Sequence, residues 1–372
     1  SWLKEGRGSL CGANGSLLLR EMGITKPLLV AGERTKNVFF ARTGMRLPVF
    51  DAFHPNPDLQ DCVAGAALYQ EKGCDGLISI GGGSAMDTAK GIKALLMTDI
   101  AHVRANQLPS EGNVPHLAIP GTAGTGAETT AVAVLYENGQ KLSVDHPALL
   151  PDGVLLDGSL LDTLPEYHRK SCAMDALAQG IESWWAKKAT PDSRIHAERA
   201  IRGVLDNLTA YLQGDRKAQD EMLHAAYESG LAILTTRTTA AHAMSYQITK
   251  KLGAAHGHAC MLTLPHLWAH LAAQAEYQPM LTELSRLLGG EKPMDGAILL
   301  KGLLAVLELD KIPMPDDATL DMLAASVNPE RLGNHPEALT TAQLRAIYVQ
   351  AFTPMTDTER AEAIAAWEQY GK

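Results

Sequence analysis

The sequence has few cysteines, and they follow no pattern. The five residues, an odd number, are widely scattered without a Cys-x-x-Cys pair: Cys11, Cys62, Cys74, Cys172 and Cys260. Disulfide-stabilised domains and zinc knuckles both need regularly spaced cysteines, so neither class is indicated. We therefore expect a protein whose thiols stay reduced, in the cytoplasm.

The sequence also lacks a long apolar run and an excess of basic residues. No stretch reaches the roughly 20 apolar residues that a membrane helix needs, and no basic-then-apolar signal region opens the chain. The 33 basic and 42 acidic residues give a formal net charge of −9. This balance argues against nucleic acid or an anionic membrane as partner. We expect a soluble protein that acts on a small molecule.

The 372 residues fall into two parts with different patterns of apolar residues. Before about residue 158, short apolar runs such as 27–30, 76–80 and 116–120 alternate with amphipathic stretches, which is typical of buried parallel strands between helices. Residues 159–372 show helical periodicity, with breaks expected at Gly203, Gly214 and Gly253 among others. We predict an α/β dinucleotide-binding domain over residues 1–158 and an all-helical metal- and substrate-binding domain over residues 159–372.

A run of three glycines, Gly81–Gly83, follows the predicted strand 77–80 and precedes Ser84. Glycines there let backbone N–H groups approach a phosphate, and a helix that begins at residue 84 or 85 adds its positive end. The pattern favours pyrophosphate binding, although it is not the G-x-G-x-x-G fingerprint. A tight turn without a ligand is the alternative.

A second glycine-rich segment, residues 121–128, follows another buried strand. Its Thr122 and Thr125 carry hydroxyl groups that could hold a phosphate or a ribose. The alternative is a threonine-rich surface turn.

Four polar residues of the second half have the spacing of metal ligands. Asp175 and Gln179 are four apart and share a helix face. His242 and His256 are fourteen apart, about 21 Å along a straight helix, so the chain must turn between them if they meet. Gly253 suits a helix end, and a new helix can begin near His256. Each residue alone is as easily an ordinary buried side chain, but together they suggest one divalent metal site.

These segments resemble the iron-containing (group III) alcohol dehydrogenase family over nearly the whole chain. The resemblance rests on Asp175-x-x-x-Gln179, on His242 with His256-Gly257 fourteen residues later, on Leu264-Pro265-His266, which we expect at a helix start, and on segments 81–90 and 121–128. Gln179 and Tyr246 stand where the family usually has histidines. The segments 179–183 and 237–246 are similar to the phosphonate-metabolism branch, which reduces phosphonoacetaldehyde.

The resemblance implies a dehydroquinate synthase-like architecture with a metal site between the two domains. The implied ligands are Asp175, Gln179, His242 and His256, for Fe²⁺ or else Zn²⁺ or Mn²⁺. The implied cofactor-binding residues are Gly32, Gly81, Gly82, Gly83, Ser84, Asp87, Thr122 and Thr125. Gly32 stands where NAD-preferring members tend to have an Asp, and Glu33 and Arg34 follow it. We therefore expect NADP or NAD, and solvated turn charges are the alternative role for Glu33 and Arg34.

The implied reaction is metal-dependent, NAD(P)H-linked interconversion of a small aldehyde and its primary alcohol, here phosphonoacetaldehyde and 2-hydroxyethylphosphonate. Tyr246 is expected to supply the proton, or else to pack structurally. Arg237 is expected to bind the phosphonate, with Lys250 in reserve, or else to pair with a carboxylate. A general short-chain alcohol dehydrogenase, a dehydroquinate synthase-like lyase and a binding protein without catalysis are the alternatives, and a homodimer is left open.

Overall fold

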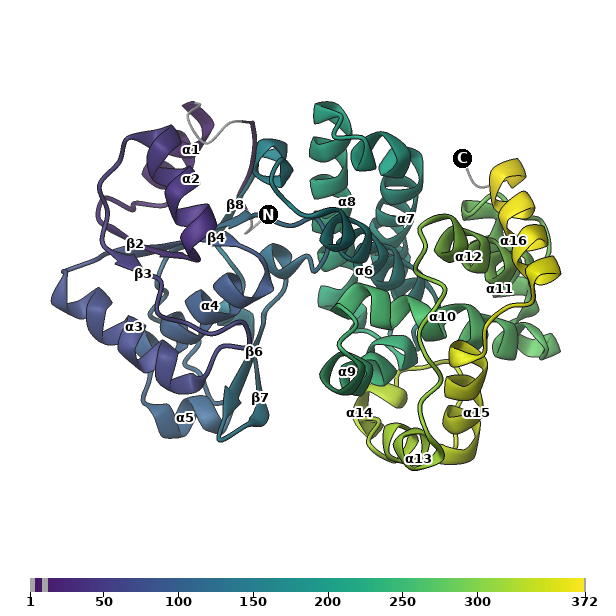
Figure 1. Ribbon diagram of the computed structural model, residues 1–372. Helices are drawn as coiled ribbons and strands as arrows, with labels where there is room; N and C mark the ends of the chain where they lie inside the picture. Colours follow the sequence, from purple (N-terminus) through teal and green to yellow (C-terminus); the bar gives the residue numbers. More distant parts are fainter. Residues whose placement is uncertain (1–3, 9–12, 371–372) are drawn as a thin grey trace. The chain divides into compact units, whose positions relative to one another are not determined.

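The computed structural model describes residues 4–8 and 13–370 and divides into two compact units, Ser1–Leu164 and Pro165–Lys372. Figure 1 shows a parallel sheet with helices in the first unit and helices in the second. The predicted fold class, an α/β domain followed by a helical one, is confirmed. Within the described ranges, no helix combines the length and apolar character that crossing a membrane requires.

The first unit is built on a six-stranded, all-parallel sheet with the order β1-β8-β5-β4-β2-β3. A separate antiparallel hairpin joins β6 to β7. The strands are β1 (Lys4–Arg7), β2 (Pro27–Ala31), β3 (Val49–Phe50), β4 (Gly76–Gly81), β5 (His116–Pro120), β6 (Val132–Glu137), β7 (Gln140–Asp145) and β8 (Gly153–Leu156). The helices are α1 (Ala13–Glu21), α2 (Glu33–Thr43), α3 (Leu59–Glu71), α4 (Gly83–Met97) and α5 (Ile100–Arg104).

Both faces of this sheet are covered, as the apolar runs of its strands predict. Along β2, Leu28 and Val30 belong to the core shared with α3 and α4, whereas Leu29 and Ala31 belong to the core shared with α1 and α2. Successive side chains of a strand point to opposite faces, so a continuous apolar run needs a layer of helices on each side. The carboxyl ends of β2, β4 and β5 are thereby held in fixed positions at one edge of the sheet.

The second unit consists of helices throughout its described residues. Its long helices include α6, α7 and α8, and α6 packs against α7, α8 and α10. The helices are α6 (Glu166–Trp185), α7 (Pro191–Leu212), α8 (Arg216–Thr236), α9 (Ala240–Leu252), α10 (His256–Ala272), α11 (Gln278–Leu287), α12 (Asp295–Val306), α13 (Asp317–Ala325), α14 (Pro329–Leu332), α15 (Thr341–Phe352) and α16 (Asp357–Tyr370). Because residues 173–185 of α6 are all buried, this helix forms the centre of the unit.

Tertiary packing overrides local sequence signals at two positions in these helices. The break expected at Gly203 is wrong, because this glycine lies inside α7 where α8 comes close: a Cβ there would lie 2.8 Å from the Cβ of Ala225. The helix start expected around Pro265 is also wrong. Pro265 lies inside α10, whose segment 257–265 is buried, so packing on all sides outweighs the hydrogen bond that a proline cannot donate.

Candidate functional site

Three polar side chains line one face of the central helix α6. Asp175, Gln179 and Glu182 follow one another at intervals of four and three residues, which places them in a row on a helix. Their exposed fractions are 2%, 4% and 0%. Buried carboxylates are costly unless other groups compensate their charge, so this row must face partners on neighbouring helices.

Glu182 fixes the position of His242 on α9. One carboxylate oxygen of Glu182 accepts hydrogen bonds from the backbone N–H of Thr239 (3.1 Å), its hydroxyl (2.8 Å) and the backbone N–H of His242 (3.2 Å). The other oxygen pairs with Nδ1 of the His242 ring. The Nε2 atom then faces Asp175, 3.0 Å from its Oδ1. A carboxylate that holds Nδ1–H leaves Nε2, once it has given up its own proton, as the electron-pair donor to a metal, as at many metal-binding histidines.

His256 is the first residue of α10, and a very close helix contact places it beside α6. α9 ends at Gly253, whose φ of 75° is the left-handed helix-ending conformation, and α10 begins three residues later. These two boundaries agree with the sequence prediction. At the next residue, Gly257, a Cβ would lie only 1.9 Å from the carbonyl oxygen of Ser171. The backbone N–H of His258 donates to the Ser171 hydroxyl (3.0 Å), which further ties α10 to α6.

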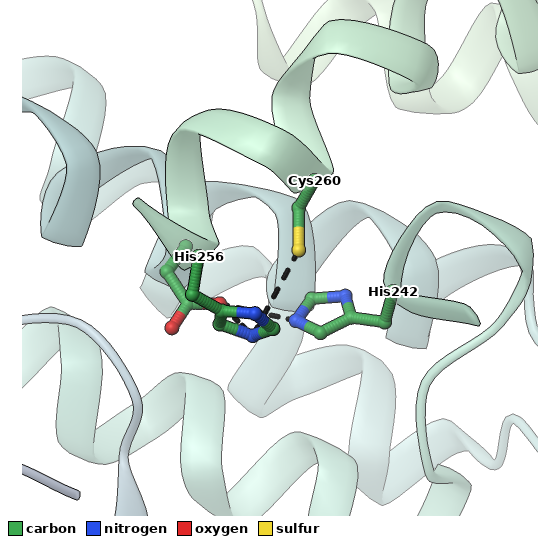
Figure 2. A group of neighbouring side chains, drawn as sticks. His242, His256 and Cys260 are labelled. Atoms are coloured by element: carbon green, nitrogen blue, oxygen red, sulfur yellow. Dashed lines mark hydrogen bonds and ion pairs between the residues drawn. The ribbon is translucent and has the colours of Figure 1, made fainter. Parts of the chain in front are cut away.

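The structure brings Asp175, His242 and His256 together with a fourth residue, Cys260 (Figure 2). The Nε2 atom of His256 lies 3.7 Å from Oδ1 of Asp175, and the Cys260 sulfur lies 3.8 Å from the same Nε2. The rings of His242 and His256 have centroids 5.2 Å apart. One potential ligand atom from each of the four residues lies within 4.8 Å of all the others. Since His256 is about half exposed, the cluster can be reached by solvent.

The electrostatics of the cluster favour its anionic donors. Burial alone would raise the pKa of Asp175, but His256 and His242 together bring it below its ordinary value. Burial would likewise raise the pKa of the Cys260 thiol, and the same two rings lower it to about 7. A carboxylate, two imidazoles and a thiol fit a divalent metal of the Zn²⁺ or Fe²⁺ type, whereas Ca²⁺ and Mg²⁺ prefer oxygen ligands alone.

Gln179 lies beside this cluster. Its Oε1 accepts a hydrogen bond from the hydroxyl of Ser229 (2.8 Å), and its Nε2 lies 3.4 Å from Oδ1 of Asp175. The structure thus places all four residues of the predicted ligand set close together. Sequence reasoning missed Glu182 and Cys260 as members of the site. The sequence signal for each residue is its spacing on a helix. Glu182 is seven residues after Asp175, and Cys260 is four residues after His256, so each shares a helix face with a predicted ligand.

Tyr246 and Arg237 flank His242 along the chain. Tyr246 is half-buried and lies one turn further along α9. Arg237 is half-buried too and ends α8, at the start of the non-helical connection 237–239 before α9. Its backbone has φ 63° and ψ 179°, a conformation that essentially only glycine adopts. The Asn334 side chain holds this connection by donating to the carbonyls of Thr236 (2.7 Å) and Thr238 (2.9 Å).

In the first unit, the two glycine segments meet at the carboxyl ends of β4 and β5. Gly81 pairs with Pro120 in the sheet, and the N–H of Gly121 donates to the carbonyl of Gly81 over 2.7 Å. A Cβ on Gly121 would lie 3.1 Å from the Cα of Gly81, and Gly81 itself has φ 148°. This close backbone approach and positive φ both require glycine.

The threonines of the second segment face the glycines of the first. A Cβ on Gly82 would lie 3.4 Å from the Thr122 methyl group, and one on Gly83 would lie 3.7 Å from that of Thr125. Helix α4 begins at Gly83, and its N-cap residue is Gly82, which has no side chain to accept hydrogen bonds from the first turn. The first N–H groups of α4 therefore lie next to two hydroxyl-bearing residues, an arrangement suited to an anionic ligand.

The other predicted cofactor residues lie around these segments. The Ser84 hydroxyl donates to the carbonyl of Pro55. Burial raises the pKa of Asp87 to about 6, and a backbone hydrogen bond from Val134 on β6 acts in the opposite direction. Gly32 is the N-cap of α2, directly after β2.

Arg34 is bonded within its own unit. Its guanidinium donates to the hydroxyl of Thr163 (2.8 Å) and to the carbonyl of Leu160 (3.3 Å). Both bonds come from the same nitrogen, Nη1, which is one of three nitrogens that carry the five N–H donors of a guanidinium.

Comparison with known proteins matches both units to one family. Residues 7–158 match the profile of the iron-containing alcohol dehydrogenases, and residues 170–352 match the C-terminal profile of the same family. A phosphonoacetaldehyde reductase from Streptomyces viridochromogenes is 36% identical over 58% of this chain and 58% of its own length. An NAD-dependent methanol dehydrogenase from Bacillus methanolicus is 30% identical over 72% of this chain and 74% of its own. The matched region of several curated relatives spans only about three fifths of their length.

Solved structures resemble the chain over a larger share. The sulfoacetaldehyde reductase of Bifidobacterium kashiwanohense, in complex with NAD⁺, superimposes with a TM-score of 0.84 at 25% identity, covering 94% of this chain and 96% of that one. An iron-containing alcohol dehydrogenase from Thermococcus thioreducens gives a TM-score of 0.82 at 26% identity, with 94% and 97% covered.

Proposed function

Because the chain belongs to the iron-containing alcohol dehydrogenase family, we propose that it is a metal-dependent NAD(P)H oxidoreductase that interconverts a small aldehyde and its primary alcohol. The observation that carries the proposal is the cluster of Asp175, His242 and His256, with Glu182 orienting the His242 ring. We further propose phosphonoacetaldehyde as the aldehyde and 2-hydroxyethylphosphonate as the alcohol.

The metal would be held by Asp175, His242 and His256. The fourth donor is either Gln179, as the sequence predicts, or Cys260. A bound divalent ion supplies Lewis acidity, which polarises an aldehyde oxygen and stabilises the negative charge that hydride transfer creates on it. The chain supplies the charge balance and the geometry: Asp175 brings a carboxylate, and Glu182 keeps the proton of His242 on Nδ1 and thus directs Nε2 toward the ligand position.

Tyr246 is the proposed proton donor for the alcohol oxygen. It lies one turn after His242 on α9, and its half-buried phenol can donate a proton. A role in packing alone would leave the reaction rate unchanged when only its hydroxyl is removed.

The dinucleotide would be bound by the two glycine segments of the first unit. The first N–H groups of α4, with Thr122 and Thr125, would hold the pyrophosphate, and Gly32 would lie near the adenosine ribose. A relative named as NAD-dependent and a similar structure bound to NAD⁺ support a nicotinamide cofactor. Gly32 carries no carboxylate that would repel the extra phosphate of NADP, and a Cβ at this position would meet nothing within 4 Å.

Arg237 is the proposed phosphonate-binding residue. Its glycine-like backbone conformation costs about 1–3 kcal/mol, and such strain is concentrated at functional sites. A guanidinium can bind a phosphonate through two parallel hydrogen bonds. Two of the similar proteins are named for short aldehydes with an acidic oxoanion group, phosphonoacetaldehyde and sulfoacetaldehyde, which supports a substrate of this class.

The test is a panel of aldehydes assayed with NADH and NADPH on the enzyme loaded with Fe²⁺, Zn²⁺ or Mn²⁺. Arg237→Ala should lower kcat/KM for phosphonoacetaldehyde roughly 100-fold, because a bidentate charged pair contributes about 3 kcal/mol, and should leave a neutral short aldehyde nearly unaffected. Lys251→Ala, which removes an exposed cation from the last turn of α9, serves as the control. Equal losses on both substrates, or a wild-type preference for the neutral aldehyde, would leave a general aldehyde reductase.

A further inference from the structure

Cys260 occupies the place of a ligand in the metal centre. It lies four residues after His256 on α10, and residues at this interval share a helix face. The side chain is completely buried, and its sulfur belongs to the group of ligand atoms that all lie within 4.8 Å of one another. Figure 2 shows the thiol directed toward the two imidazole rings.

The side-chain amide of Gln179 forms hydrogen bonds with neighbouring residues. Its amide oxygen lies 2.8 Å from the Ser229 hydroxyl, whose single proton is shared between this oxygen and the Ala226 carbonyl, also 2.8 Å away, and its NH₂ group lies 3.4 Å from Oδ1 of Asp175. An amide in this orientation presents hydrogen-bond donors to the carboxylate and no oxygen to a cation. It can therefore orient Asp175, whereas the thiol of Cys260 is left as the nearby electron-pair donor.

We propose that the thiolate of Cys260 is the fourth protein ligand of the metal, and that Gln179 is a positioning residue for Asp175. The inference rests on the metal centre of the proposed function. When the metal binds, a sulfur–metal bond forms and the thiol proton passes to solvent. A thiolate and a carboxylate then balance the two charges of the ion, which matters in a buried site because an uncompensated charge is costly there.

The ligand set Asp/His/His/Cys has a chemical consequence. A thiolate is softer than an amide oxygen or an imidazole, so this chain should favour Zn²⁺ or Co²⁺ over Mn²⁺ more strongly than an all-oxygen-and-nitrogen site would.

Reconstitution of the chelator-treated, full-length protein with Co²⁺ tests this assignment. The wild-type protein should show a thiolate-to-cobalt charge-transfer band in the near ultraviolet. Cys260→Ser should bind Co²⁺ without that band and should bind Zn²⁺ at least about 100-fold more weakly in a chelator competition, since loss of an outer partner alone costs 10–100-fold. Cys172→Ala, which removes a thiol of α6 outside the cluster, should retain both the band and the affinity.

The outcomes separate the ligand assignment from the metal centre itself. Uptake of Co²⁺ by the wild-type protein without a charge-transfer band overturns the role of Cys260 alone. Failure of the wild-type protein to take up any Co²⁺ or Zn²⁺ overturns the metal centre as well. A Gln179→Ala variant that keeps the charge-transfer band, while its Zn²⁺ affinity falls less than that of Cys260→Ser, supports the positioning role, and the reverse order of affinities contradicts it.

Discussion

The close contact at Gly257 makes a single methyl group a severe perturbation of the proposed site. In Gly257→Ala, the new Cβ would lie 1.9 Å from the carbonyl oxygen of Ser171, 2.7 Å from the backbone nitrogen of Asp175 and 2.8 Å from its Cβ. Two of these atoms belong to the α6 backbone, so no rotation of a side chain can relieve the overlap. The start of α10 must move away from α6, and His256 must move with it.

Two effects of this substitution oppose each other. Alanine is favoured over glycine inside a helix by about 1 kcal/mol. Relieving the overlap needs a shift of about 1.3 Å, from 1.9 Å to an ordinary contact near 3.2 Å, and overpacking of this kind costs typically 1–3 kcal/mol or more. Because the overlap is with a backbone atom at 1.9 Å, the cost lies at the upper end of this range, and we expect a net loss of about 2 kcal/mol in the free energy of unfolding. Ligand distances tolerate only about ±0.2 Å, so Zn²⁺ affinity should fall at least 100-fold, the upper end of what loss of an outer partner costs.

Urea unfolding of the metal-free protein and a Zn²⁺ competition titration measure the two losses. Gly253→Ala is a matched control in the same segment: its Cβ would meet nothing within 4 Å, but its φ of 75° disfavours alanine by about 1–2 kcal/mol. The control should lose stability and keep its Zn²⁺ affinity. A Gly257→Ala protein that binds Zn²⁺ as tightly as the wild type would refute the proposed position of His256 beside Asp175.

Two further predictions concern buried carboxylates. Glu182→Gln should weaken Zn²⁺ binding 10–100-fold, because an amide that donates to Nδ1 of His242 would move the ring proton to Nε2, and an unchanged affinity in a competition titration would contradict this role. Glu128 is buried with one carboxylate oxygen unpaired, and burial raises its pKa to about 7. Between about pH 4.5 and pH 7, Glu128 is therefore protonated in the folded state and ionised in the unfolded state. Its contribution lowers the free energy of unfolding progressively as the pH rises through this window. Glu128→Gln should be more stable than the wild type in urea unfolding, by on the order of 2 kcal/mol at pH 8 and by less at pH 5, and an equal difference at both pH values would contradict the assignment.

The sequence predicts features that depend on local chemistry. The end of α9 at Gly253 and the start of α10 at His256 follow from a residue that adopts positive φ and from a spacing that one straight helix cannot bridge.

Features that depend on which helices touch could not be predicted in this way. The spacing from His256 to Cys260 shows a shared face, but only the packing of α10 on α6 shows that this face meets Asp175. The role of Glu182 likewise depends on the position of the α8–α9 connection. The misplaced break at Gly203 and helix start at Pro265 have the same origin, since neighbouring helices decide what these residues do.

Aldehyde reduction should depend on a metal held by Asp175, His242 and His256. One measurement tests this dependence most directly. NADPH and NADH oxidation with phosphonoacetaldehyde should be followed for the chelator-stripped protein, for the same protein after Zn²⁺ or Fe²⁺ is restored, and for His242→Ala. We expect stripping to lower the rate at least about 100-fold, restoration to recover it, and His242→Ala to gain nothing from added metal. A stripped protein, or a His242→Ala variant, that reduces the aldehyde at the wild-type rate would contradict the claim.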